Sequence, residues 1–255
     1  YCQQNRADAS EIDFALKYTQ KGNIDFGVMS ATERDEKFSQ GRDFYALRLN
    51  TKTNNLKYGY LGTYVDKPVT GENAQVNSFD FLYLPSEIHR MNGNFMHSSV
   101  DNQDGFGLTL GYAYNPNRDF SSGIGINNYD DRLDLNDMGY LILNDRFMFN
   151  GRTQFKRTTF NEGSILRSRL FEIGYGSKFN VDSQRESSNF ALKLENNYVN
   201  LSELKAEVFY RSTGRNTRIT RGSQISPFIK MPKGIGGYID LTGPRRPTYL
   251  SLIHI

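Results

Sequence analysis

The chain has 255 residues, a net charge of +3, a hydrophobic content of 37% and a mean hydropathy of −0.62. No stretch approaches the roughly 18 consecutive apolar residues that a spanning helix needs, which excludes a helical membrane protein. Acidic and basic residues are mixed along the chain, so no nucleic-acid partner is expected. The single cysteine, Cys2, provides neither a disulfide framework nor a cysteine-based metal centre.

Apolar side chains alternate with small or polar ones in stretches that recur along nearly the whole chain. In chain order, the clearest cover residues 12–18, 24–28, 45–49, 56–64, 79–83, 106–114, 171–175, 190–194 and 204–210. A period of two places successive side chains on opposite faces of a β-strand. Roughly a dozen stretches follow this pattern, most near ten residues long, whereas strands of soluble proteins usually have about five or six.

The connections between these stretches tend to alternate in length. Short ones are predicted near Gln20–Asn23, Thr51–Asn55, Asn115–Asp119, Thr159–Gly163 and Asn200–Ser202. Longer ones are predicted near Glu33–Arg42, Asp66–Gln75, Asn128–Asp145, Val181–Ser188 and Arg211–Pro227. Pro85–Asn92 and Asp101–Asp104 do not fit, the first being long for a turn and the second short for a loop. Tight turns alternating with long loops are typical of outer-membrane barrels.

The run GFGLTLGYAYN at residues 105–115 has one apolar face and one nearly bare face. We expect the large side chains to face lipid; they are Phe106, Leu108, Leu110 and Tyr112, followed by Tyr114 near the turn. The small side chains are expected to face inward, with something bulky packed against them; they are Gly105, Gly107, Thr109, Gly111 and Ala113.

Two folds are compatible with long alternating strands. One is a soluble antiparallel sandwich with its apolar faces packed inward; the other is a transmembrane β-barrel. The barrel is favoured by strand length, by aromatic residues at strand ends and by charges in mid-strand, which suit a watery lumen. The charges are Asp25, Arg48, Lys57, Asp80, Lys193 and Lys205. We therefore predict an all-β fold, an antiparallel transmembrane barrel present as an incomplete fragment of about 12–14 strands.

Candidate sites are few. Asp134 and Asn136 match part of a calcium-binding loop, although Met138 occupies a ligand position and Asp145 stands where glutamate is usual; the alternative is a solvent-exposed loop. Arg215, Arg218 and Arg221 could bind anionic sugars or lipopolysaccharide phosphates, or could pair with internal carboxylates.

No catalytic constellation is found. His97 lies beside Ser98, but neighbouring residues of a strand point to opposite faces, and no orienting acid is evident for a pairing with Ser99. No cofactor motif occurs, so no cofactor is expected and an enzyme is the less favoured interpretation.

Four segments resemble the barrel region of carbohydrate-binding family 9-like proteins, whose C-terminal domain has unknown function. They are KGNIDFGVMSATE (21–33), DFYALRL (43–49), LNDMGYLILND (135–145) and TRGSQISPF (220–228). The chain departs from the family pattern at Ile24, where tryptophan is usual, at Asp137 (proline), at Leu143 (arginine) and at Ser223–Gln224 (glycine–proline).

The resemblance extends over nearly the whole chain. It implies that residues 1–255 form one partial barrel domain of a Gram-negative outer-membrane protein, lacking a preceding carbohydrate-binding-like domain and the C-terminal part of the barrel. The last residues, LSLIHI, resemble translated sequencing-adapter read-through.

The expected partners are outer-membrane lipid and an oligo- or polysaccharide. The expected function is passage or uptake of glycans or other polar solutes across the outer membrane. One alternative is a membrane anchor for a carbohydrate-binding domain; hydrolysis of glycosyl bonds is less favoured.

Overall fold

The structure is a computed structural model that describes residues 12–35, 40–68, 71–139, 141, 144–180, 185–215, 229–243 and 247–248. Within these residues the regular elements are β-strands. They are β1 (Ile12–Gln20), β2 (Ile24–Glu33), β3 (Asp43–Lys52), β4 (Leu56–Lys67), β5 (Glu72–Ser86), β6 (His89–Val100), β7 (Gln103–Asn117), β8 (Phe120–Tyr129), β9 (Arg146–Arg157), β10 (Leu166–Phe179), β11 (Arg185–Tyr198), β12 (Glu203–Arg215), β13 (Ile229–Thr242) and β14 (Pro247–Thr248). No helix in this described part is long and apolar enough to cross a membrane.

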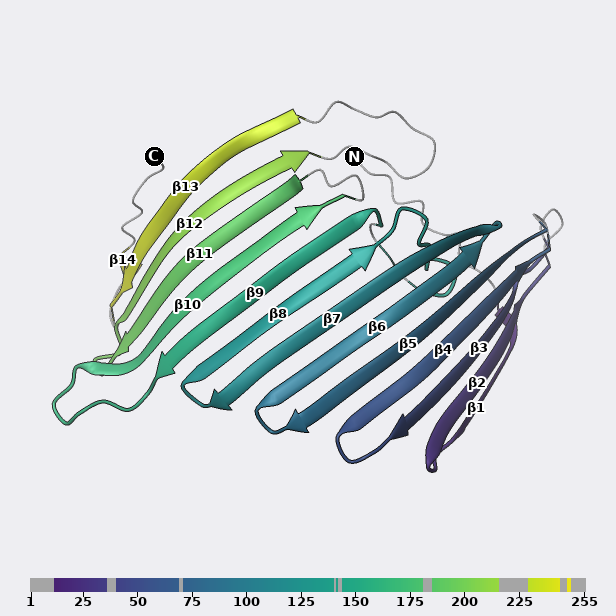
Figure 1. Cartoon of the computed structure of the whole chain (residues 1–255), viewed down its shortest axis with the longest axis horizontal. Helices are drawn as coiled ribbons and strands as arrows, with labels where there is room; N and C mark the ends of the chain where they lie inside the picture. The colour runs from purple at the N-terminus through teal and green to yellow at the C-terminus, as the bar shows by residue number, and fades with distance from the viewer. Residues whose placement is uncertain are drawn as a thin grey trace. The chain divides into compact units, whose positions relative to one another are not determined.

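The strands form one sheet in which hydrogen-bonded neighbours follow chain order from β1 to β14 (Figure 1). Strands that follow each other along the chain are antiparallel, as between β2 and β3 or β10 and β11. The prediction of an all-β antiparallel fold of long strands is therefore confirmed. All but the two-residue β14 are long, from the nine residues of β1 to the fifteen of β5 and β7.

The residues fall into two compact units. The first comprises Tyr1–Tyr83, Asn92–Leu108 and Tyr129–Asp145, and the second comprises Leu84–Met91, Thr109–Asn128 and Arg146–Ile255.

Register in both units aligns the alternating apolar residues of neighbouring strands. In the first unit Phe26 pairs with Leu49, Leu49 with Tyr60, and Tyr60 with Phe79. In the second unit Ile173 pairs with Leu192, which pairs with Val208. Directly paired side chains share a face, so each unit has one face that carries these residues and one that does not. We call the first the aromatic face and the opposite one the polar face.

Several predicted connections differ from the structure: strands also extend into those predicted at Asn115–Asp119, Val181–Ser188 and Arg211–Pro227. The β4–β5 connection covers only residues 68–71, because Asp66 and Lys67 continue the ladder opposite Asn73 and Glu72. The β5–β6 connection is the two-residue turn 87–88, and Pro85 lies inside β5 near its end, where a missing N–H is tolerated. The β9–β10 connection covers residues 158–165 and is longer than the predicted turn. For the β4–β5 and β5–β6 connections the sequence overestimates the loop, because polar residues near strand ends can still pair in the ladder.

The β8–β9 connection ends at Asp145 as predicted and begins two residues later than predicted, at Asp130. Asp131, Arg132 and Asn136 are exposed, as expected for a solvent-exposed loop, but other residues of the connection are not. Leu133 is completely buried. Met138 and Phe44 pack against a cluster of Val65, Ala74 and Val100. This part of the connection therefore forms the core of the first unit together with the ends of the surrounding strands.

Candidate functional site

The aromatic face of each unit is exposed. Phe79, the central residue of β5, has a relative exposure of 48%. Val208 on β12, in the second unit, has a relative exposure of 58%. Large apolar patches on a protein surface mark contact with another protein or with a membrane. An exposed apolar face on both units therefore needs a partner of low polarity.

Aromatic rings on this face gather near both ends of the strands. In the first unit Tyr58, near the β3–β4 turn, packs against Phe79 in mid-β5 with ring centroids 6.4 Å apart, and Tyr45 and Tyr64 pack at 6.2 Å near the other end. Leu47 and Leu49 follow Tyr45 on the same face of β3, and Leu49 is level with Tyr60 and Phe79 in the register.

The second unit has the same arrangement. Near the β9–β10 connection, Phe155 packs against Phe120 at 5.0 Å and against Phe171 at 6.3 Å. Near the opposite ends of β9 and β10, Phe147 packs against Phe179 at 6.3 Å. A third pair, Phe149 and Tyr175 at 5.5 Å, lies between them along β9 and β10, so rings recur along these strands. Aromatic rings near strand ends are typical of strands that cross a bilayer.

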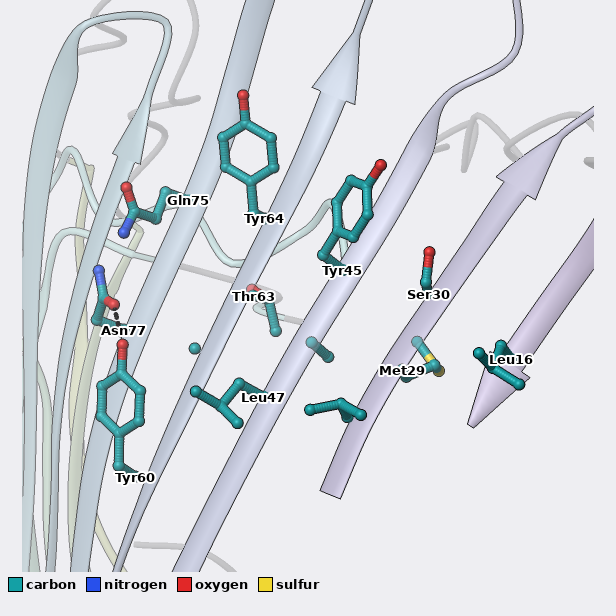
Figure 2. Close-up of a pocket in the computed structure, with 13 residues that line it drawn as sticks. Leu16, Met29, Ser30, Tyr45, Leu47, Tyr60, Thr63, Tyr64, Gln75 and Asn77 are labelled. Atoms are coloured by element: carbon teal, nitrogen blue, oxygen red, sulfur yellow. Dashed lines mark hydrogen bonds between the residues drawn. The ribbon is translucent and has the colours of Figure 1, made fainter. Parts of the chain in front are cut away.

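A depression of about 420 Å³ lies on the aromatic face of the first unit, and Figure 2 shows its lining. The rings of Tyr45 and Tyr64 stand beside it on neighbouring strands, and the Tyr60 hydroxyl donates a 2.5 Å hydrogen bond to Oδ1 of Asn77. Tyrosine rings with an apolar body and a polar tip suit the boundary between lipid and water.

The polar face of the first unit carries a cluster of charged and amide side chains. Arg48 pairs with Asp80 in a bidentate way, with Nη1–Oδ2 at 2.5 Å and Nη2–Oδ1 at 3.0 Å. Both side chains are 36% exposed. They line a depression of about 670 Å³ that also includes Asp25, Asn50 and Lys57.

Gly59 makes the Arg48–Asp80 pair possible. Arg48 is on β3 and Asp80 is on β5, so the guanidinium must cross β4, which lies between them. A Cβ at Gly59 would lie 2.6 Å from Nη2 of Arg48 and 2.6 Å from Oδ1 of Asn50. Any larger residue at this position would therefore displace the arginine.

Two transverse rows of charges cross the polar face of the second unit. In one row, register places Glu172 opposite Gln154 and Lys193, and Glu207 opposite Lys193 and Tyr238. In the other row, Lys205 is opposite Glu195 and Asp240. Opposite charges facing each other across strands are stabilising, and they leave no block of a single sign.

Hydrogen bonds and ion pairs tie these rows together. Nε2 of Gln154 donates to Oε2 of Glu172 at 2.6 Å, and Nζ of Lys193 lies 3.3 Å from Oε2 of Glu195. Arg211 lies 3.8 Å from Glu207 and stacks over the ring of Phe209, 4.1 Å from its centroid. The polar face thus offers paired charges, hydroxyl and amide groups and an aromatic ring.

Arg42, in the connection between β2 and β3, is bound to the end of β2. Its Nε and Nη2 donate to the two carboxylate oxygens of Glu33 at 2.8 and 2.7 Å. The hydrogen bond to Glu33 raises the pKa of the Arg42 guanidinium above its usual value. A raised pKa on a cation means that the pair's contribution to stability is complete below the usual arginine pKa and is lost only at still more alkaline pH.

The two histidines of the described residues lie on strands. Nδ1 of His89 is 2.7 Å from the Tyr112 hydroxyl, and Nε2 of His97 is 3.3 Å from Oδ1 of Asp104. The Asp104 contact was missed from the sequence; the turn at Asp101 and Asn102, both with positive φ, folds Asp104 back beside His97. Ser98 is completely buried and its Oγ accepts a hydrogen bond from the Asp134 N–H, so His97 and Ser98 do not form a pair.

The structure does not assemble a metal site at Asp134 and Asn136, and it describes only one of the three candidate arginines. Oδ1 of Asp134 accepts bonds from the N–H and side-chain amide of Asn136, and no group of three or more potential His, Cys, Asp or Glu metal ligands occurs in the described ranges. Arg215 is the last residue of β12, while Arg218 and Arg221 lie outside the described residues.

Of the residues predicted to face lipid, Phe106 and Leu110 have exposed side chains, and Leu108 and Tyr112 have intermediate exposure.

Comparison of the chain with protein-family models, curated proteins and solved structures finds no match.

Proposed function

We propose that the chain forms part of an outer-membrane β-barrel of a Gram-negative bacterium that lets glycans or other polar solutes cross the membrane. The observation that carries the proposal is the contrast between the two faces of long antiparallel strands. One face exposes aliphatic and aromatic residues, such as Leu47, Leu49 and Phe79, and the other carries paired charges such as Arg48 and Asp80. Lipid outside and water inside account for both faces.

The pairing of charges supports uncharged polar solutes as the cargo. Selection of one kind of ion uses rings of charges of a single sign. Here glutamates and lysines alternate across β10, β11 and β12, and Arg211 stacks on Phe209. Sugars present both hydroxyl groups and apolar C–H faces, which such a surface can bind weakly and release. The resemblance of the sequence to carbohydrate-binding family 9-like proteins also supports a sugar as the solute.

An anchoring role is the second candidate, and the packing of the β8–β9 connection favours it. Buried Leu133 and half-buried Met138 lie against the strands of the first unit, so part of that unit's polar face is occupied by the chain itself. A barrel filled in this way could serve only to hold a carbohydrate-binding domain at the membrane.

Solute uptake by proteoliposomes distinguishes the two candidates. We expect vesicles containing the full-length protein to swell in isotonic monosaccharide and disaccharide, more slowly as the sugar becomes larger, and to show discrete current steps in planar bilayers. Vesicles made with heat-denatured protein provide the control. Folded protein that gives neither swelling nor current would contradict the passage of solutes and leave anchoring.

A further inference from the structure

The segment 130–139 of the β8–β9 connection lies against the polar face of the first unit, and three sets of contacts hold it there. The first is apolar. Leu133 is completely buried over the glycines of β7: a Cβ at Gly105 would lie 2.3–2.4 Å from backbone atoms of Arg132 and Leu133, and one at Gly107 would lie 2.7 Å from Cδ2 of Leu133. The prediction that something bulky packs against the small residues of this run is confirmed for these two glycines.

The second set consists of backbone hydrogen bonds to one carboxylate. Oδ1 of Asp130 accepts from the N–H groups of Arg132 and Leu133 at 3.1 and 2.7 Å, and Oδ2 accepts from the N–H of Phe106 at 2.8 Å. Asp130 therefore fixes the start of the segment to β7 and shapes the turn that delivers Leu133 to the sheet.

The third set joins the far part of the segment to other strands. The N–H of Asp134 donates to Oγ of Ser98 on β6 at 3.0 Å, and Nζ of Lys67 at the end of β4 lies 2.8 Å from Oδ1 of Asp137. The Lys67 and Asp137 side chains are only 20% and 18% exposed, so this pair is shielded from solvent. The segment thus spans from β7 towards β4.

We infer that the segment 130–139 is a constriction: it narrows the passage along the polar face and sets the largest solute that passes. The inference rests on the proposed function. It goes beyond that function by assigning the size limit of the solute to one segment of the chain and to the glycines against which that segment packs. The packing of Leu133 and the shielded ion pair hold the segment firmly against the sheet, because moving it away would expose Leu133 and separate Lys67 from Asp137.

The substitution Gly105→Ala tests the constriction, because a single methyl group would meet the segment's backbone. The matched control is Gly174→Ala on the polar face of β10, where a Cβ has no neighbour within 4 Å. We expect Gly105→Ala to increase trypsin cleavage after Arg132 on the order of tenfold, since overpacking favours the open form and proteolysis follows the population of that form. We also expect a larger single-channel conductance and swelling in a larger sugar, with Gly174→Ala equal to wild type.

The outcomes separate this inference from the proposed function. If wild type conducts, and Gly105→Ala is cleaved faster but conducts no more than wild type, the segment does not narrow the passage and the inference is wrong. Current from Gly105→Ala but not from wild type means that the segment closes the passage completely. No current from either folded protein contradicts both proposals. Should Gly105→Ala fail to fold, Leu133→Ala removes the apolar anchor from the connection without altering a strand, and the same measurements decide.

Discussion

At the scale of single residues, small side chains decide where larger ones can lie. Gly59 leaves room for the Arg48 guanidinium to cross β4, and Gly105 leaves room for the backbone at Leu133. The sequence indicates that these glycines sit on the bare faces of alternating runs. It does not indicate which side chain fills the space, because that depends on the register of strands two positions away.

Asp80→Asn tests whether the Arg48–Asp80 pair lies in a solute pathway. The change keeps the shape of the side chain and leaves the positive charge of Arg48 without its partner. In an open lumen we expect the zero-current potential in a salt gradient to shift towards anion selectivity. The cost in stability should remain below about 1 kcal/mol, because the pair is partly exposed.

Arg48→Gln is the complementary variant. It leaves Asp80 unpaired and should shift the potential in the opposite direction. A shift of the same sign in both variants, or no shift in either, would place this pair away from the conducting pathway.

At the scale of elements, alternation predicted the strands well and their ends poorly. The period of two correctly placed the strands around Leu47, Leu110 and Ile173. The ends of β4 and β5 were missed because Lys67 and Glu72 are polar yet still pair in the ladder. The packing of the β8–β9 connection was also missed: a segment rich in aspartate is expected in solvent, and only the tertiary structure reveals that Asp130 caps backbone groups and Asp137 pairs with Lys67.

Strand β7 allows a comparison of its two faces at adjacent residues. Leu110 lies in mid-strand with an exposed side chain, and Thr109 points to the other face. Leu110→Arg should lower the free energy of unfolding by about 2–4 kcal/mol if this position faces the middle of a bilayer.

Thr109→Arg is its matched control and should cost little in a water-filled lumen. Urea titration of the folded protein in lipid vesicles, monitored by far-ultraviolet circular dichroism, measures the free energy of unfolding of both variants. Equal losses at the two positions would indicate a packed interior on both faces.

At the scale of the whole molecule, both units carry aromatic rings near the strand ends of one face, with further rings such as Phe79 and Tyr175 in mid-strand. On β10, Phe171 and Phe179 are the outermost rings of the aromatic face, and their separation of eight residues corresponds to ~27 Å along an antiparallel strand. Strand tilt reduces this span towards the height of an outer-membrane apolar band, about 25 Å. A span of this height is compatible with a bilayer as the cover of the aromatic face.

The central claim is that the aromatic face meets lipid and the polar face meets water, and adjacent residues of β10 test it most directly. Ile173 is on the aromatic face and Gly174 is on the polar face. In a background with Cys2→Ser, a nitroxide spin label is attached to Ile173→Cys or Gly174→Cys, and the protein is reconstituted in lipid vesicles. Electron paramagnetic resonance then measures the collision of each label with oxygen, which concentrates in lipid, and with a water-soluble nickel chelate.

We predict that the label at position 173 collides mainly with oxygen and the label at position 174 mainly with the nickel chelate. Access of the nickel chelate to position 173, or exclusion of both reagents from it, would contradict a lipid-facing sheet; exclusion of both is the result expected for the buried face of a soluble sandwich.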